Sequence, residues 1–330
     1  MVDYRAGISI GQANRFVAYR PDLASARREG PSCIMRVFSF SSTQTLLVAS
    51  LAVALCGSVW GVFWLPLRWL DAKGVGGGWK ALIFNLVSLL APLPFLLDRT
   101  KWAGFVRHAP AGLLLGTAFS LYTVSLVMTD VLHAILLFYL TPVWSTLAAR
   151  ILFGARLTVS RIIAIVLGLS GMAILLGAGD GLPLPRNAGD WVALVSGMLW
   201  AAGTMHSYAR PASGVALPVF SFSLGGVISS ALVLAVALQM DLPLAASGAL
   251  APSLPWIILA ALIFFVPPNF LILWAAQRLD PGRIGILLTT EVMVGAISAA
   301  LLSGEAFGTP EFVGTAFIIG AGLVEVLGRR

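Results

Sequence analysis

The sequence predicts an all-α integral membrane protein with ten transmembrane helices, arranged as two inverted repeats of five helices each. Charged residues make up 11% of its 330 residues and hydrophobic residues 58%, and its mean hydropathy is +0.93. A soluble globular domain carries about 25% charged residues, so apolar surface in this amount must face lipid. The apolar residues also fall into runs long enough to cross a bilayer, and segments of the first half recur in the second.

Ten apolar runs approach the length of a membrane span, which is about 20 residues for a hydrocarbon core of about 30 Å. They lie at residues 46–66, 80–97, 109–128, 132–153, 160–178, 190–209, 216–239, 255–277, 283–303 and 311–327. Residues suited to helix N-termini stand at four of the starts, namely Asp130, Ser160, Asp190 and the Thr309-Pro310-Glu311 sequence.

Basic residues set the predicted orientation, because Lys and Arg in short loops stay on the cytoplasmic side. Residues 1–45 contain six arginines and no apolar periodicity, so we expect a disordered cytosolic tail, with Met35 as a second candidate for the translation start. With the N-terminus inside, both termini and 17 of the 21 basic residues are cytoplasmic. The opposite side keeps Arg68, Lys73, Lys80 and Arg186. Topology therefore explains the net charge of +7, and we expect no nucleic-acid partner.

A duplication divides the chain into two halves. A constant offset of 150 positions aligns residues 133–176 with residues 283–326, and an offset of 140 aligns Gly57, Trp60 and Gly61 with Gly197, Trp200 and Ala201. We expect repeats at 46–178 and 190–327. Since each holds an odd number of spans, the second inserts in the opposite sense. Inverted repeats are typical of secondary transporters, whose binding site lies near the bilayer midplane between the halves.

Glu291 is the most informative single residue. Counted from Arg283, it lies roughly 12 Å into its span, where a charged group costs about 2.5–3.5 kcal/mol. One interpretation is a carboxyl group that pairs with a substrate ammonium or exchanges a proton for the substrate. The other is a protonated side chain that makes a hydrogen bond between helices.

Asn269 follows Pro267 and Pro268 inside the eighth span. Two prolines remove two amide donors and open the preceding turn. Broken helices mark binding sites in transporters, and a simple packing kink is the alternative.

Trp60 and Trp200 are related by the duplication, so one is expected in each half. As a pair they would form aromatic walls around an apolar side chain, or a cation-π face for an ammonium group. The alternative is packing against lipid or a neighbouring helix.

Tyr139 and Thr141 lie beside Pro142, a predicted break in the fourth helix, and Asn85 is a polar residue in the second span. Each is a candidate substrate contact, with a hydrogen bond between helices as the alternative. No His, Cys or acid has metal-ligand spacing with another, so we expect no metal and no cofactor.

At these positions the chain resembles the EamA-type, ten-helix members of the drug/metabolite transporter superfamily, over about residues 46–327. The resemblance is carried by Trp60-Gly61, Leu140-Thr141-Pro142-Val143, Leu152-Phe153-Gly154, Arg156-Leu157-Thr158, Thr290-Glu291-Val292 and Ser303-Gly304-Glu305. Two positions depart from the family pattern, since Ala155 replaces an acid and Val292 replaces a proline. The resemblance implies a basket of ten helices that exports amino acids or related small metabolites across a bacterial inner membrane.

We therefore expect a secondary transporter that works by alternating access, binds a small molecule within the lipid bilayer and is a monomer or weak homodimer. Efflux of lipophilic or quaternary cations is the alternative within transport. A membrane-embedded enzyme or a lipid-handling scaffold is the alternative of another class. Intramembrane catalysis needs converging acid, base or metal groups, and the sequence offers one deep acid, so we expect no enzyme.

Overall fold

The computed structural model describes residues 42–102, 104–129, 131–154, 157–175, 184–239, 246–303 and 308–327. Within these ranges the chain is helical apart from turns, short connections and one isolated β-bridge between Val75 and Ser247. This confirms the all-α class. The predicted tail lies outside the described ranges except for residues 42–45, which already belong to the first helix. Asp130, Ala155, Arg156, Gly304 and Glu305 also lie outside them.

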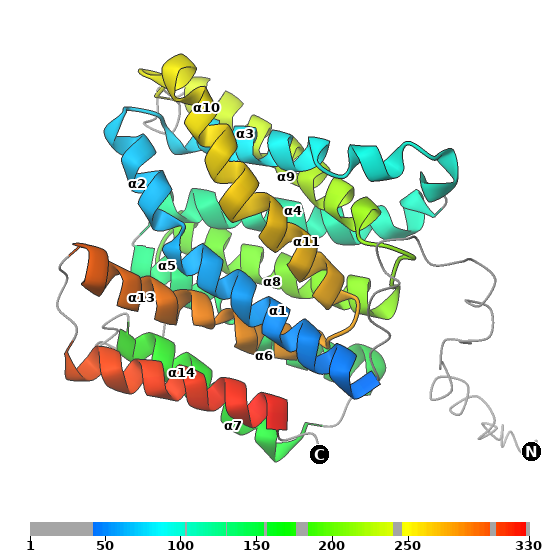
Figure 1. Ribbon diagram of the computed structural model, residues 1–330. Coiled ribbons are helices and arrows are strands. Elements are labelled where there is room, and N and C mark those ends of the chain that lie inside the picture. The colour runs from blue at the N-terminus through cyan, green and yellow to red at the C-terminus, as the bar shows by residue number, and fades with distance from the viewer. Residues whose placement is uncertain are drawn as a thin grey trace, which may run out of the picture. The chain divides into compact units, whose positions relative to one another are not determined.

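Helices occur at all ten predicted positions, some as two consecutive segments (Figure 1). The first half contains α1 (Ser42–Val62), α2 (Trp64–Ala72), α3 (Gly77–Leu90), α4 (Phe105–Met128), α5 (Val131–Phe138), α6 (Thr141–Phe153) and α7 (Val159–Leu175). The second half contains α8 (Ala188–Ala209), α9 (Ala216–Gln239), α10 (Leu250–Ala260), a π-helical segment (Ala261–Phe265), α11 (Val266–Ala276), α12 (Pro281–Leu288), α13 (Thr290–Ser303) and α14 (Thr309–Leu327).

Seven helical stretches of the described residues are long and apolar enough to cross a membrane. They run over residues 43–72, 77–96, 134–151, 216–239, 250–276, 281–302 and 309–327. The chain is therefore a multi-pass membrane protein. That α4, α7 and α8 also span the bilayer stays a prediction.

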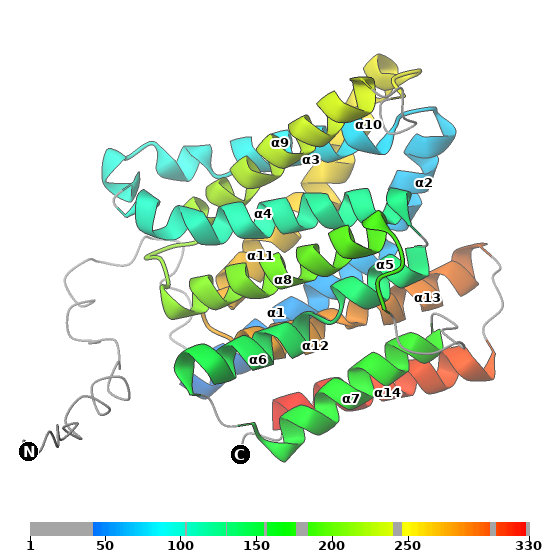
Figure 2. The same cartoon turned by 180° about the vertical axis from the view of Figure 1, so that it is seen from behind.

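Neighbouring helices pack closely through small residues. Helix α4 packs against both α8 and α9, and α7 packs against α14, as both views show (Figures 1 and 2). A side chain at Gly116 of α4 would collide with the backbone of Phe222 and Gly226 on α9. One at Gly171 of α7 would lie 2.7 Å from the carbonyl oxygen of Gly314 on α14. Since lipid is as apolar as these surfaces, van der Waals packing between closely approaching backbones contributes to helix association.

We expect Gly116→Val to lower the unfolding free energy by about 1–3 kcal/mol, because the added methyl groups force α4 away from α9. Gly77→Val is the matched control, since no atom lies within 4 Å of a Cβ placed at Gly77. Thermal melting of the purified proteins in detergent measures both. Equal melting temperatures for Gly116→Val and wild type would contradict the close packing.

The helix starts correct two of the predicted caps. At α8 the N-cap is Asn187, whose side chain accepts from the backbone N–H of Asp190 at 3.0 Å. Asp190 lies inside the first turn and accepts from the N–H of Arg186 at 2.7 Å. At α7 the N–H of Arg161 donates to the hydroxyl of Thr158 at 3.3 Å, so Thr158 takes the role predicted for Ser160. The reason is geometric, because a cap must precede the amides that it satisfies.

Candidate functional site

Two helix breaks meet at the candidate site. One separates α5 from α6 at Tyr139, and the other separates α12 from α13 at Thr289. These two positions differ by 150, the offset of the predicted duplication. The hydroxyl of Tyr139 donates to the Oε2 atom of Glu291 at 2.6 Å and lies 3.3 Å from the carbonyl oxygen of Leu288. The first break therefore contacts the second directly.

Different residues produce the two breaks. In the first, Pro142 lacks an amide hydrogen, and the Thr141 hydroxyl donates to the carbonyl oxygen of Phe138 at 2.6 Å. The second has no proline. There the hydroxyls of Thr289 and Thr290 donate to the carbonyl oxygens of Ile286 at 2.6 Å and Leu287 at 2.9 Å. These hydroxyls satisfy carbonyl groups that the helix has released.

The duplicated glycines lie against the breaks. On α1, a side chain at Gly57 would collide with the hydroxyl of Thr290, and one at Gly61 would lie 2.6 Å from the carbonyl oxygen of Glu291. On α8, a side chain at Gly197 would lie 2.6 Å from the carbonyl oxygen of Phe138. The first helix of each half therefore packs on the break of the other half. This packing explains why positions 57, 61 and 197 are glycines.

Aromatic rings surround the meeting point of the breaks. The ring of Phe138 stacks on Tyr122 with 4.3 Å between centroids, and it contacts Tyr139 at 5.3 Å and Trp200 at 6.1 Å. Trp200 is buried, and its indole N–H finds no hydrogen-bond acceptor among the described residues. The indole N–H of Trp60 is buried in the same way. The two duplicated tryptophans thus provide two buried donors as well as two ring faces.

Trp60 contacts a different part of this aromatic group. Its ring lies 6.1 Å from Phe119, which in turn lies 5.3 Å from Phe265. Trp60 directly precedes Gly61, the residue that packs on Glu291. The structure therefore places Trp60, Trp200, Tyr139, Thr141 and Glu291 at or beside the two breaks.

Asn269 and Asn85 belong to a separate polar group between α3, α9 and α11. The Asn269 amide donates to the hydroxyl of Ser88 at 3.2 Å, and Ser223 donates to the same hydroxyl at 2.8 Å. Asn85 donates to the carbonyl oxygen of Ala81 at 2.8 Å, one turn back in its own helix. The Asn269 bond fits the alternative interpretation, in which an amide holds two helices together, whereas the Asn85 bond stays within α3.

The eighth helix opens ahead of Pro267 and Pro268, as predicted. The preceding turn is the π-helical segment Ala261–Phe265, which is the response to two missing amide donors. The carbonyl oxygen of Pro268 lies 3.4 Å from the Cys56 sulfur on α1, consistent with a weak S–H hydrogen bond. The break is therefore close to α1.

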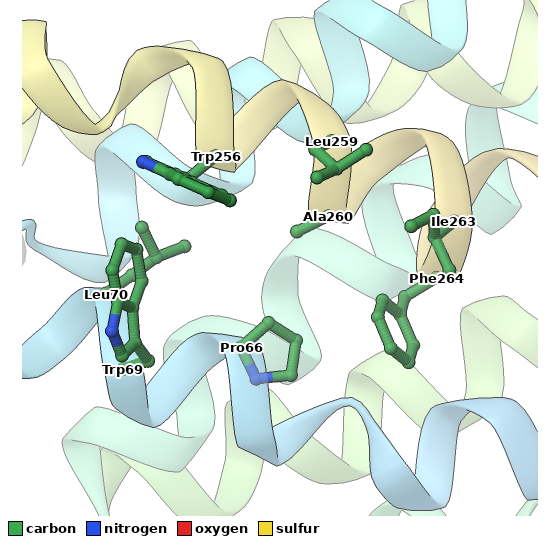
Figure 3. A pocket seen from close by; sticks show the side chains of 8 residues that line it. All are labelled: Pro66, Trp69, Leu70, Trp256, Leu259, Ala260, Ile263 and Phe264. Carbon is green, nitrogen blue, oxygen red and sulfur yellow. The ribbon is translucent and has the colours of Figure 1, made fainter.

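Two of the cavities formed by described residues lie away from the helix breaks. The larger, of about 390 Å³, lies between α2 and α10 and is lined by aromatic and aliphatic side chains (Figure 3). The smaller, of about 10 Å³, lies between α3, α4 and α9. Glu291, which is half-buried, lines neither of them. Among the described residues no group of three His, Cys, Asp or Glu side chains is placed to hold a metal ion.

The sequence analysis did not predict that Thr289 and Thr290 cause a helix break. It also did not predict that the ring of Phe138 contacts Tyr122, Tyr139 and Trp200. The sequence did contain a signal for the break at Thr289 and Thr290. With the offset of 150, Thr290 aligns with Leu140, which directly precedes Thr141 and Pro142 at the predicted break of the fourth helix. Nothing local in the sequence distinguishes Phe138 from the other 17 phenylalanines.

A multi-pass helical membrane protein in which two broken helices meet at an intramembrane carboxyl group has the architecture of a membrane transporter. Residues 46–177 match the model of the EamA-like transporter family, which belongs to the drug/metabolite transporter superfamily. The expected resemblance is thereby confirmed over the first half.

Solved structures share the fold. One crystal structure matches with a TM-score of 0.65 at 20% sequence identity, over 87% of this chain and 99% of the other. In all, 28 chains of solved structures match. A comparison with curated proteins found no match.

Proposed function

We propose that the protein is a secondary transporter that exports amino acids or related small metabolites by alternating access. The observation that carries this proposal is the hydrogen bond between Tyr139 and Glu291, which joins the broken helix of one half to the broken helix of the other. A carboxyl group held at such a meeting point can bind a cationic group or a proton. A change in its partner would also alter the contact between the halves.

The proposed architecture has ten spans in two inverted repeats, at residues 46–178 and 190–327. The equivalent breaks and the reciprocal packing of Gly57 and Gly197 support it, because a twofold relation exchanges such contacts. The excess of basic residues in alternate loops supports cytoplasmic termini. The composition and family are consistent with the inner membrane of a bacterium.

An amino acid fits the chemistry of this site. The carboxylate of Glu291 would pair with the substrate ammonium group, and the buried indole N–H groups of Trp60 and Trp200 would donate to the substrate carboxylate. The rings of Phe138 and Tyr122 would contact an apolar side chain. Each polar end of the substrate would then find a partner within the bilayer.

Efflux of lipophilic or quaternary cations is the second candidate, and the aromatic rings around Glu291 favour it. Such a cation needs one carboxylate and ring faces, but it makes no use of an indole N–H. Loss of the indole N–H groups of Trp60 and Trp200 should therefore weaken transport of an amino acid but not of a quaternary cation.

Counterflow into proteoliposomes tests the proposal, with a panel of labelled amino acids and one quaternary cation. We expect uptake of a zwitterionic amino acid, and we expect Trp60→Phe and Trp200→Phe each to lower kcat/KM for it by about tenfold, because each loses a hydrogen bond to a charged group. Trp191→Phe is the matched control, since Trp191 is 58% exposed.

Uptake of the cation alone, unaffected by both tryptophan variants, would instead establish the second candidate. Failure of every panel member to exchange would contradict both. We expect activity from the monomer, because the site is formed within one chain, so a dependence of uptake on dimerisation would contradict the monomeric pathway.

A further inference from the structure

The cavity between α2 and α10 is a groove open to the surface of the helices. Trp69 and Trp256 form one end, where their rings meet edge to face with 5.8 Å between centroids, and Ile263 and Phe264 form the other end (Figure 3). Trp256 and Phe264 are eight residues apart, so the groove follows α10 and the π-helical segment after it for roughly 12 Å. This length can hold part of an extended hydrocarbon chain.

The groove faces lipid rather than water. Trp69, Trp256 and Ile263 are 45%, 56% and 52% exposed. They belong to the stretches 43–72 and 250–276, both long and apolar enough to cross the membrane. All eight lining side chains are aromatic or aliphatic. An occupant from the bilayer would therefore be apolar over this length.

The end of the groove formed by Trp69 and Trp256 is near one membrane face. The chain leaves α2 here and begins α10 here, and the two connections are tied by a backbone hydrogen bond from Gly76 to Ala246 at 2.7 Å. Exposed tryptophans at this depth are typical of the headgroup level. An occupant would thus place a polar head beside Trp69 and Trp256.

A cation extends the groove toward that face. Pro66, Trp69, Leu70 and Lys73 recur at helical spacing, so Lys73 continues the groove-lining face of α2 by one turn. The ammonium group of Lys73 lies 5.5 Å above the ring of Trp69. The nearby carboxylate of Asp71 is already paired with Lys80, so it does not cancel the charge of Lys73. The first turns of α10 carry no charged residue.

We propose that this groove binds an anionic glycerophospholipid, with one acyl chain between α2 and α10 and the phosphate group at Lys73. The groove buries apolar surface of the chain, and the cation selects an anionic head. This site is separate from the proposed transport site, since none of the residues at the two helix breaks lines the groove.

Native mass spectrometry of the purified protein in detergent tests the proposal. The protein is titrated with phosphatidylglycerol or with phosphatidylcholine carrying the same acyl chains. We expect wild type to prefer phosphatidylglycerol about fivefold, and Lys73→Gln to remove the preference. Arg68→Gln is the matched control, because it removes the same charge from α2 off the groove face, and it should keep the preference.

Ile263→Trp tests the acyl-chain part of the proposal by filling the groove. The larger ring would displace part of the acyl chain from the groove. We expect this to weaken binding of both lipids by at least about tenfold, which corresponds to two methylene groups that are no longer buried. Ile228→Trp on α9, at a position 58% exposed, is its control. Binding of both lipids with equal strength to wild type, or full binding by Ile263→Trp, would overturn the proposal. So would a dimer that forms through this face and disappears in Ile263→Trp.

Discussion

The Glu291→Gln variant is expected to lose at least about 30-fold in kcat/KM for the transported amino acid while remaining folded. Glutamine keeps the shape of the side chain and an oxygen that accepts the hydrogen bond from Tyr139. It cannot pair with an ammonium group or carry a proton. Removal of one partner of a buried charge pair costs about 2–5 kcal/mol, and the lower limit corresponds to about 30-fold.

Counterflow in proteoliposomes measures this loss, and melting in detergent checks that the variant is folded. Glu311→Gln is the matched control, because the Glu311 carboxylate caps the start of α14 by accepting from the N–H of Gly308 at 2.7 Å. We expect Glu311→Gln to transport normally. Full activity in Glu291→Gln would remove the carboxylate from the mechanism and leave Glu291 as a hydrogen-bond acceptor between the halves.

The positions of the helices could be predicted from the sequence because length and hydropathy are local properties. Each predicted run overlaps a helix, and most starts differ by two to five residues. The starts differ because caps lie ahead of the apolar residues, as Asn187 and Thr158 do. The break near Pro142 and the open turn before Pro267 were predictable from the same local chemistry, since proline lacks an amide hydrogen.

The contacts of the candidate site depend on long-range packing and were less predictable. Tyr139 and Glu291 were both candidate residues, but the duplication aligns Glu291 with Thr141 and gives no reason for its bond to Tyr139. The break at Thr289 depends on which hydroxyl finds which carbonyl group, and no proline indicates it. For Asn269 and Asn85 the sequence leaves a substrate contact and a structural hydrogen bond as alternatives. In the structure the first donates to Ser88 on another helix and the second to its own helix.

The structure contains a buried ion network that the sequence analysis does not predict. Arg161 had been counted among the basic residues that set the orientation. In the structure its guanidinium group donates to both carboxylate oxygens of Glu325, at 2.8 and 3.1 Å, and to Asp280 at 2.7 Å. These residues join α7 to α14 and to the N-cap of α12. Arg161 and Glu325 are both buried, so each requires the other.

We expect Arg161→Met to lower the unfolding free energy by about 3–5 kcal/mol, because it leaves Glu325 buried without its ionic partner. Arg107→Met is the control, since Arg107 is exposed at the start of α4 and its loss should cost little. Equilibrium unfolding in mixed detergent micelles measures both changes. A loss below about 1 kcal/mol in Arg161→Met would show that water reaches Glu325 and that the network contributes little.

The double variant Arg161→Met, Glu325→Leu removes both partners of the ion pair. It tests whether the stability lost in Arg161→Met comes from a buried Glu325 carboxylate without a partner. A buried ion pair replaced by apolar residues of similar volume is often neutral in stability. We therefore expect the double variant to recover most of the stability that Arg161→Met loses. Asp280 still caps α12 in this background, because its other oxygen accepts from the N–H of Arg283 at 3.1 Å. If the double variant is no more stable than Arg161→Met, the guanidinium group acts by packing against Gly282 rather than by neutralising Glu325.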